Sequence, residues 1–466
     1  MSALDKLPNL TALIGDRTLR LAVTGLSRSG KTVLVASLVQ NLMSTVRAPG
    51  ALPFLRAAAE RRMVEVRRMA RPDGEDVPQF PLDATIGALA ADPPQWPAST
   101  TDLRRLRLSL RFAPAGFLGS LKLLSGGDRI TIEILDYPGE WLLDLPLLRQ
   151  SYAEWSRATL ALAHRGARAP LARDWLDYVA RHSAHSGDET ETSLRAHEIY
   201  RSYLALCRER EQLSLLQPGR FLNPGEIVDP SVLWFCPLPF PVGGGARSSS
   251  LAALMEARFD AYKRTIVQPF FAELARRADR QIVLVDILRA LNAGEEAFAD
   301  QRLALDTILA AFRFGRRSPF RVLFGARIDR VLFAATKADH VPGLQRDHLE
   351  ALMANLVEAP SLRAKVARAR VAATAIASVR CTEDGTDLID GRKVDVVVGL
   401  PQGGKRRIRF FPGIVPMTPP PTGFWGERFT EFPVFQPPRI DSAPGAGIPH
   451  INLDKALDFL LEDILA

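Results

Sequence analysis

The chain has 466 residues, 47% of them apolar and 24% charged, which excludes a collagen-like or largely disordered protein and allows a sizeable core. Three cysteines are too few for a disulfide framework or a four-ligand zinc site, and they favour a reducing, cytoplasmic setting. The net charge of +8 is spread along the chain, so nucleic acid is not the expected partner, and no run of about 18 apolar residues predicts a membrane span.

Apolar periodicity predicts strands and helices that alternate along the chain. Strands are predicted at 18–24, 103–112, 129–135, 281–286, 330–336 and 371–375, with 103–112 and 129–135 paired as an antiparallel hairpin. Helices are predicted at 31–47, 56–70, 146–165, 168–185, 190–213, 248–279, 294–313, 343–368 and 452–465. Residues 390–440 are rich in proline and short strands. This order predicts an α/β fold with a mostly parallel sheet flanked by helices.

A glycine-rich segment joins the first predicted strand to the first helix. Residues 25–32, GLSRSGKT, match the P-loop pattern G-x-x-x-x-G-K-[ST]. The backbone N–H groups of such a loop and the positive end of the helix favour a bound phosphate. We expect Lys31 to bridge the β- and γ-phosphates and the Thr32 hydroxyl to bind Mg²⁺. The residues predicted to contact the nucleotide in this segment are Gly25, Ser27, Arg28, Ser29, Gly30, Lys31, Thr32 and Val33.

An acidic residue ends the third predicted strand. Asp136 can hold Mg²⁺, directly or through water. Gly139 completes a D-x-x-G pattern, whose glycine N–H can bind the γ-phosphate and move when it leaves, as in switch GTPases. A serine or threonine of residues 99–101 is expected to reach the Mg²⁺ as well. We favour Thr100, and the alternative is a turn that caps the next strand.

The segment Thr336–Asp339, TKAD, follows a predicted strand and resembles the N-K-x-D motif that reads guanine. The Asp339 carboxylate can accept hydrogen bonds from guanine N1–H and the 2-amino group, a pair that adenine does not offer. Lys337 would lie over the base plane. Downstream, Ser378 and Val379 can supply a backbone N–H to guanine O6. Because unpaired buried polar groups cost about 1–3 kcal/mol each, such a site rejects the wrong base.

Two residues depart from the pattern of small switch GTPases. Glu140 stands where those proteins place a glutamine that orients the attacking water. Glu140 can accept a proton from water, but it adds negative charge near the γ-phosphate. Arg28 can supply a positive charge in cis, as an arginine finger does, or it can face solvent or a partner. We therefore expect slow hydrolysis that dimerisation or a partner stimulates.

These motifs together resemble the YcjX-like family of bacterial P-loop proteins. The resemblance rests on LAVTGLSRSGKT (21–32), WPAST (96–100), LDYPGEWLLDLPLL (135–148), RQIVLVDIL (280–288) and TKAD (336–339). It implies a GTPase-like domain with a helical insertion, in the bacterial cytoplasm. It also implies a stress- or envelope-linked process and a membrane-protein partner that would bring the chain to the inner membrane.

The spacing of the motifs predicts the domain organisation. Asp136 and Asp339 lie 203 residues apart, whereas two β–α–β units need about 60 residues, so a helical insertion lies between them. We predict the first part of the GTPase domain at 1–140, with an insertion at about 48–98. A helical insertion domain at 141–279, the second part at 280–380 and a short β-rich C-terminal extension at 381–466 follow.

The motifs favour a Mg²⁺-dependent protein that binds GTP and GDP and hydrolyses GTP slowly as a molecular switch. Two alternatives stay open. The first is a scaffold that holds GDP without useful turnover and docks a membrane partner through its helical insertion. The second is a P-loop ATPase or kinase, which would prefer adenine and would not depend on Asp339. A homodimer is also open, because the sequence does not determine the oligomeric state.

Overall fold

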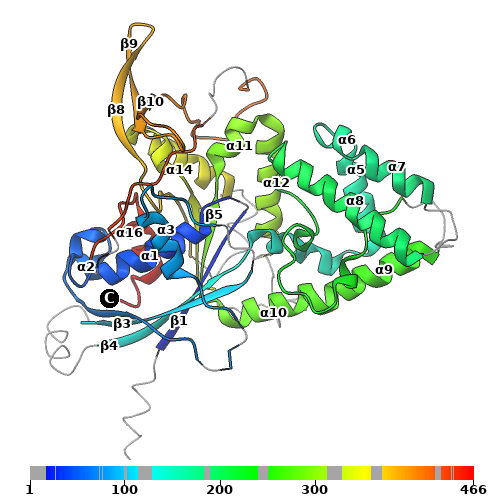
Figure 1. The fold of residues 1–466 in the computed structure, drawn as a ribbon, viewed down its shortest axis with the longest axis horizontal. Helices are drawn as coiled ribbons and strands as arrows, with labels where there is room; N and C mark the ends of the chain where they lie inside the picture. Colours follow the sequence, from blue (N-terminus) through cyan, green and yellow to red (C-terminus); the bar gives the residue numbers. More distant parts are fainter. Residues whose placement is uncertain are drawn as a thin grey trace, which may run out of the picture.

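The computed structural model places the predicted strands in one central sheet (Figure 1). It describes residues 17–26, 28–72, 74–75, 77–98, 102–113, 128–182, 189–239, 250–311, 328–357, 370–425, 432–441, 443 and 445–465. Within these ranges no helix is both long enough and apolar enough to cross a membrane.

The sheet has seven strands in the order β2–β3–β4–β1–β5–β6–β7. Their bounds are Arg17–Gly25 (β1), Met63–Arg68 (β2), Arg104–Phe112 (β3), Asp128–Asp136 (β4), Arg280–Val285 (β5), Arg330–Ala335 (β6) and Arg370–Ala375 (β7). Strands β4, β1, β5, β6 and β7 run parallel, whereas β3 is antiparallel to both β2 and β4. The predicted α/β fold with a mostly parallel sheet is therefore confirmed.

The parallel strands are apolar because helices cover both faces of the sheet. Every residue of β5 is buried, and successive side chains enter different cores because they point to opposite faces. Ile282 and Leu284 pack in the core that holds α1 (Lys31–Ser44), α3 (Leu82–Ala90) and α16 (Leu453–Leu461). Val283 and Val285 pack with α11 (Ile287–Ala293), α12 (Glu295–Ala311) and α14 (Gly343–Val357).

The helix predicted over 56–70 is wrong. Only Arg56–Ala59 is helical (α2), and the chain then enters β2, which pairs with β3 at the edge of the sheet. Met63 and Val66 are buried, and the register shifts by a bulge between Met63 and Glu65. The bulge breaks the strict alternation of a strand, so the basic segment has a helix-like spacing although its hydrogen-bond partner is another strand.

Between β4 and β5 the chain forms a group of helices beside the sheet (Figure 1). They comprise a 3₁₀ helix at Gly139–Arg149, α5 (Tyr152–Ala163), α6 (Arg168–Leu171), α7 (Arg173–His182), α8 (Glu189–Glu209), short 3₁₀ turns at Gly219–Phe221 and Pro230–Leu233, α9 (Ser250–Tyr262), a π turn at Lys263–Val267 and α10 (Gln268–Arg277). These helices have an aromatic core of their own, in which Trp155 stacks on Phe259 with ring centroids 5.1 Å apart. The core makes the group a packed unit rather than a loose loop.

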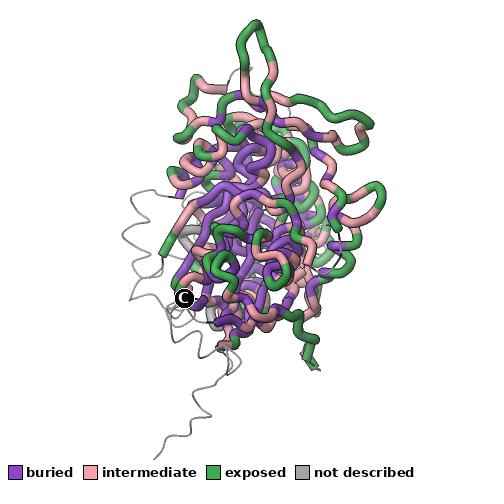
Figure 2. Tube along the Cα trace, turned by 90° about the vertical axis from the view of Figure 1, so that its left-hand side faces the viewer, coloured by how far each residue is buried: buried purple, intermediate pink, exposed green. Residues whose placement is uncertain are grey.

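A second sheet follows β7. It is antiparallel, in the order β10–β9–β8, with bounds Thr382–Ile389 (β8), Arg392–Gly399 (β9) and Ile408–Phe410 (β10). The β8–β9 hairpin projects from the body of the molecule, and its tip is exposed (Figures 1 and 2).

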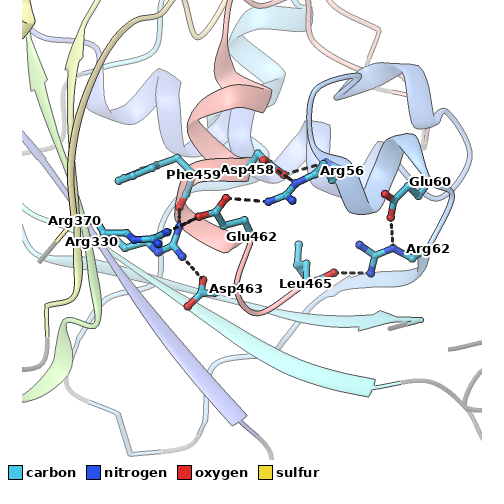
Figure 3. Close-up of polar contacts among 10 residues, drawn as sticks. All are labelled: Arg56, Glu60, Arg62, Arg330, Arg370, Asp458, Phe459, Glu462, Asp463 and Leu465. Carbon is cyan, nitrogen blue, oxygen red and sulfur yellow. Dashed lines mark hydrogen bonds and ion pairs between the residues drawn. The ribbon is translucent and has the colours of Figure 1, made fainter. Parts of the chain in front are cut away.

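The last helix, α16, is fixed against the sheet by ion pairs (Figure 3). Glu462 binds Arg330 at 2.6 Å, Arg370 at 3.0 Å and Arg56 at 2.9 Å. Arg56 also binds Asp458, at 3.2 Å. These contacts join the C-terminal end of the chain to α2, β6 and β7, which come from three distant parts of the sequence.

Candidate functional site

The glycine-rich loop connects β1 to α1, as its pattern predicts. Gly30 has φ +85° and Arg28 φ +64°, so the loop turns through the left-handed region twice before the helix begins. Lys31 Nζ donates a hydrogen bond to the carbonyl oxygen of Gly25, at 2.8 Å. The lysine side chain thus folds back towards the start of the loop. Ser27 lies outside the described residues.

The loop is packed too closely for a side chain at Gly25. A Cβ there would lie 2.6 Å from the Cβ of Leu284 on β5. Gly139 approaches from the other side, and a Cβ on it would collide with the carbonyl group of Gly25. The two glycines of the predicted motifs are therefore in direct contact, and the D-x-x-G segment rests on the phosphate loop.

Parallel pairing brings Asp136 beside the phosphate loop. In the register of β1 and β4, Asp136 lies opposite Val23, two residues before the loop begins. Asp136 is 1% exposed and Thr32 8% exposed. A carboxylate and a hydroxyl are the oxygen donors that Mg²⁺ accepts, so these residues fit the ion. The described part of the chain contains no group of three or more His, Cys, Asp or Glu that could hold a metal, so phosphate oxygens would have to complete the coordination. Thr100, the other predicted ligand, lies outside the described residues.

The TKAD segment follows β6 and is held by contacts with later parts of the chain. Lys337 has φ +62°, and its Nζ pairs with the Asp286 carboxylate at 2.6 Å. Asp339 is 2% exposed, and its Oδ2 accepts a hydrogen bond from the backbone N–H of Cys381 at 2.8 Å. Burial, together with the charge of Asp339, raises the pKa of the Cys381 thiol well above its usual value. This thiol therefore stays protonated beside the carboxylate.

The loop predicted to meet the base lies between TKAD, α1 and the C-terminal segment. The Ser37 hydroxyl on α1 donates to the carbonyl of Ser378. Ala377 and Ile451 exchange two backbone hydrogen bonds, at 3.1 and 2.9 Å. The side chain of Asn452 donates to the carbonyl of Ala375 at 2.9 Å. The C-terminal segment thus supports this loop from behind.

One cleft of about 740 Å³ joins the two ends of the predicted site. The predicted residues that line it are Arg28, Ser29, Gly30, Lys31, Thr32, Val33, Glu140, Thr336, Lys337, Asp339, Ser378 and Val379. Gly25, Gly139 and Asp136 are not among the lining residues. The structure therefore brings motifs more than 300 residues apart into one cavity.

Several lining residues were not predicted. Asp286 directly follows β5, and the signal that singled out Asp136 and Asp339, an acid at or just after the end of an apolar strand, could have found it. Arg289 follows on α11. Gln212 and Asn223 reach the cleft from the helical group between β4 and β5. No local pattern marks Gln212 or Asn223, because only the packing of that group against the sheet brings them to the cleft.

The segment after Gly139 is anchored to the same helical group. Glu140 is 5% exposed and lines the cleft, and Gly219 packs against its carbonyl group. Asp144 accepts the Gly219 N–H at 2.7 Å and the Tyr262 hydroxyl proton. Burial raises the pKa of Asp144 to about 6, although these two hydrogen bonds oppose the shift. Arg220 lies 3.2 Å above the Trp141 ring. A movement of this segment would therefore displace Gly219 and Tyr262, which it contacts in the helical group.

The parallel sheet, with a strand–glycine loop–helix unit at its centre, defines an α/β protein with a P-loop GTPase-like fold. The chain matches the YcjX-like family, DUF463, over residues 19–465 and belongs to that family. It is similar to a protein of Escherichia coli K12 named Ras-like GTPase YcjX, at 37% identity over 471 residues, with 98% of each chain covered. A protein of the same name from Shewanella oneidensis MR-1 is 35% identical over 478 residues, which cover 99% of this chain and 97% of that one. The resemblance drawn from the motifs is confirmed.

Proposed function

We propose that this chain binds guanine nucleotide with Mg²⁺ and hydrolyses GTP, working as a molecular switch. One observation carries the proposal: the phosphate loop and the TKAD segment line a single cleft. A cleft built in this way can hold phosphates at one end and a base at the other. Both relatives named above are called Ras-like GTPases and align with nearly the whole chain, which supports the same function here.

At the phosphate end, the loop supplies backbone N–H groups and the start of α1 supplies partial positive charge. Lys31 would leave the Gly25 carbonyl and bridge the β- and γ-phosphates. Gly139 would offer its N–H to the γ-phosphate. Since Gly139 rests against Gly25, loss of the γ-phosphate would free both segments to move.

Mg²⁺ would be held by Thr32 and Asp136, with Thr100 as the predicted third protein ligand. When bound, the ion supplies positive charge to the phosphate oxygens and helps to neutralise the charge that develops during hydrolysis. The side chains provide two or three oxygens for this ion, so its affinity would depend on the nucleotide that completes the coordination.

At the base end, Asp339 would accept hydrogen bonds from guanine N1–H and the 2-amino group. Its Oδ2 already accepts the Cys381 N–H, which fixes the orientation of the carboxylate. Thr336 and the stem of Lys337 would border the base, and a backbone N–H at Ser378 or Val379 would meet O6. This arrangement would favour guanine over adenine, because adenine leaves these groups unpaired.

In the reaction, water attacks the γ-phosphorus in line, and the bond to the β–γ bridging oxygen breaks to give GDP and phosphate. Glu140, buried at the cleft wall, would orient the water and accept its proton. Its negative charge near the γ-phosphate makes slow turnover the expected result, while Arg28 would offset part of that charge. Turnover by the free protein above about 1 s⁻¹, the low end of stimulated rates, contradicts this part of the proposal.

The test is nucleotide binding by calorimetry with GDP, GTP, ADP, ATP and a xanthine nucleotide, on the wild type and on Asp339→Asn. We expect the wild type to prefer guanine and the variant to prefer xanthine nucleotide, because the amide donates where the carboxylate accepts. Equal or tighter adenine binding that the substitution leaves unchanged would favour the ATPase or kinase alternative. Copurified GDP with very slow exchange and no turnover would favour the GDP-holding scaffold.

The domain division is also a proposal, and the other expectations from the sequence stay predictions. We propose the division into a GTPase domain in two parts (1–140 and 280–380), a helical insertion (141–279) and a C-terminal extension (381–466). A cytoplasmic location, a stress- or envelope-linked process, a membrane-protein partner and a homodimer stay predictions from the sequence.

A further inference from the structure

Two arginines line the cleft on the side that faces the helical group between β4 and β5. Arg28 belongs to the phosphate loop and is exposed. Arg289 lies on α11, four residues after the end of β5, and is half-buried. Gln212, from the helical group, lines the same part of the cleft. Three separate elements therefore meet beside the phosphate loop.

The orientation of Arg289 is determined by contacts at two points. Its Nε donates to Gln212 Oε1 at 2.7 Å, and its backbone N–H donates to Asp286 Oδ1 at 3.1 Å. The other carboxylate oxygen of Asp286 pairs with Lys337. The Asp286 carboxylate therefore holds the backbone of Arg289 with one oxygen and the ammonium group of Lys337 with the other.

The charges around Arg289 are unfavourable as they stand. Burial and the neighbouring charges of Arg28 and Arg208 lower the pKa of Arg289, and Asp286 opposes that shift. Like charges in a half-buried cleft repel each other more than they would in water. A polyanion between the two arginines would relieve this repulsion.

We propose that Arg28 and Arg289 bind the phosphate chain of the nucleotide from the side of the helical group, and that Gln212 is the positioning residue for Arg289. This inference rests on the proposed function, to which it adds Arg289 as a phosphate-binding side chain. It also gives the helical group a role in nucleotide retention, because Gln212 from that group holds the Arg289 side chain that binds the phosphates. The consequence is slow release, since the nucleotide then joins the sheet to the helical group.

The test measures release of N-methylanthraniloyl-GDP from the full chain after a chase with excess GDP. We expect Arg289→Ala to accelerate release by about 10- to 100-fold, the range of one or two charge-assisted hydrogen bonds. Arg28→Ala, whose side chain is exposed and whose loss spares the core, is expected to accelerate release by about tenfold. Arg289→Lys keeps the charge and is expected to restore part of the retention.

Gln212→Ala separates positioning from a general structural effect. Alone it is expected to accelerate release by about three- to tenfold, and in the Arg289→Ala background it is expected to add nothing, because its action passes through the arginine. Additive effects of the two substitutions would overturn the assignment of Gln212. Arg210→Ala is the matched control, since Arg210 is an exposed arginine of the same helical group that is not among the lining residues.

The outcomes distinguish this inference from the proposed function. If the wild type retains the labelled GDP and Arg289→Ala and Arg28→Ala release it at the wild-type rate, the inference fails and the proposed function stands. If Arg210→Ala accelerates release as much as Arg289→Ala, a loss of net charge explains the effect and the inference fails as well. If the wild type binds no guanine nucleotide, the proposed function fails first.

Discussion

The two ends of the cleft are built in different ways. The phosphate end comes from one continuous segment, residues 25–33, whose shape depends on glycine conformations and on the start of α1. The base end is assembled from TKAD, the loop after β7 and the C-terminal segment, which lie up to 116 residues apart in the chain. A local motif can therefore form the first end, whereas the second needs the whole fold.

This difference predicts how substitutions act. At the phosphate end, a change in one side chain should alter phosphate binding and leave the rest of the cleft in place. At the base end, a change far from the base should loosen nucleotide binding, because the loop at 377–379 depends on α1 and on the C-terminal segment. The three predictions below test this contrast, from the largest expected effect to the smallest.

The largest effect is expected at Lys31. Replacing it with alanine removes the side chain that would bridge the β- and γ-phosphates, so single-turnover GTP hydrolysis should fall by about 10²- to 10³-fold. The fold should be unchanged, because the lysine makes one hydrogen bond to the Gly25 carbonyl that water can replace. Quenched-flow measurement of phosphate release checks the rate, and Lys455→Ala, on α16, serves as the control. Equal rates in the two variants would contradict the assigned role of Lys31.

The second prediction tests whether Glu140, at the phosphate end, is held in place by a buried carboxyl of the helical group, Asp144. Asp144 binds the N–H of Gly219, which packs on the carbonyl of Glu140. Because burial raises the pKa of Asp144 from 3.8 to about 6, the folded state binds its proton more tightly than the unfolded state. This carboxyl therefore adds stability as the pH falls from 7 towards 4, and its contribution is lost as the pH rises through about 6.

Asp144→Asn removes this titration and keeps a polar side chain of the same shape. The free energy of unfolding of the wild type, relative to the variant, should rise by about 1 kcal/mol between pH 7 and pH 5. His197 acts in the opposite direction, since burial lowers its pKa to about 4, but it is present in both proteins and cancels in the difference. Urea unfolding followed by tryptophan fluorescence gives the two curves. A difference that does not change with pH would mean that Asp144 is already ionised at pH 5 in the folded protein.

Most of the sheet could be predicted from the sequence, because six of its seven strands lie at predicted segments and the apolar residues of β1, β4, β5 and β6 are largely buried. Strand β2 could not be predicted. The bulge between Met63 and Glu65 hides the alternation of a strand, and only the pairing with β3 shows that this basic segment is extended. The segments that meet in the cleft could also be predicted, from local patterns at 25–33, 136–140 and 336–339. Each pattern ends a strand, and the ends of parallel strands meet at one edge of the sheet.

The supports of these segments could not be predicted. Gln212 and Asn452 carry no motif, and their hydrogen bonds reach residues 77 positions away in the chain in both cases. Asp286 could be predicted only in part. Its place directly after β5 is a local signal, whereas its pairing with Lys337 is a tertiary contact that the sequence does not indicate. The sequence therefore indicates where ligands can bind more readily than it indicates what holds the binding groups in place.

The smallest expected effect tests the base end from a distance. Asn452 has φ +54°, a conformation that asparagine and glycine tolerate, and its side chain donates to the Ala375 carbonyl at 2.9 Å. Asn452→Gly keeps the backbone conformation and removes the hydrogen bond, at a cost of about 1 kcal/mol. If that cost falls on the loop that meets the base, GDP should bind up to about fivefold more weakly.

Tripolyphosphate, which has no base, should compete for the phosphate loop equally well in the wild type and in Asn452→Gly. Competition against labelled GDP measures both affinities in the same protein. Asn355→Ala is the control, because Asn355 on α14 bonds the carbonyls of Ala351 and Met417 and does not contact the base loop. Weaker tripolyphosphate binding in Asn452→Gly would show that the two ends of the cleft are mechanically joined. Unchanged GDP binding would show that the loop holds its shape without the C-terminal segment, and the base end would then be as self-contained as the phosphate end.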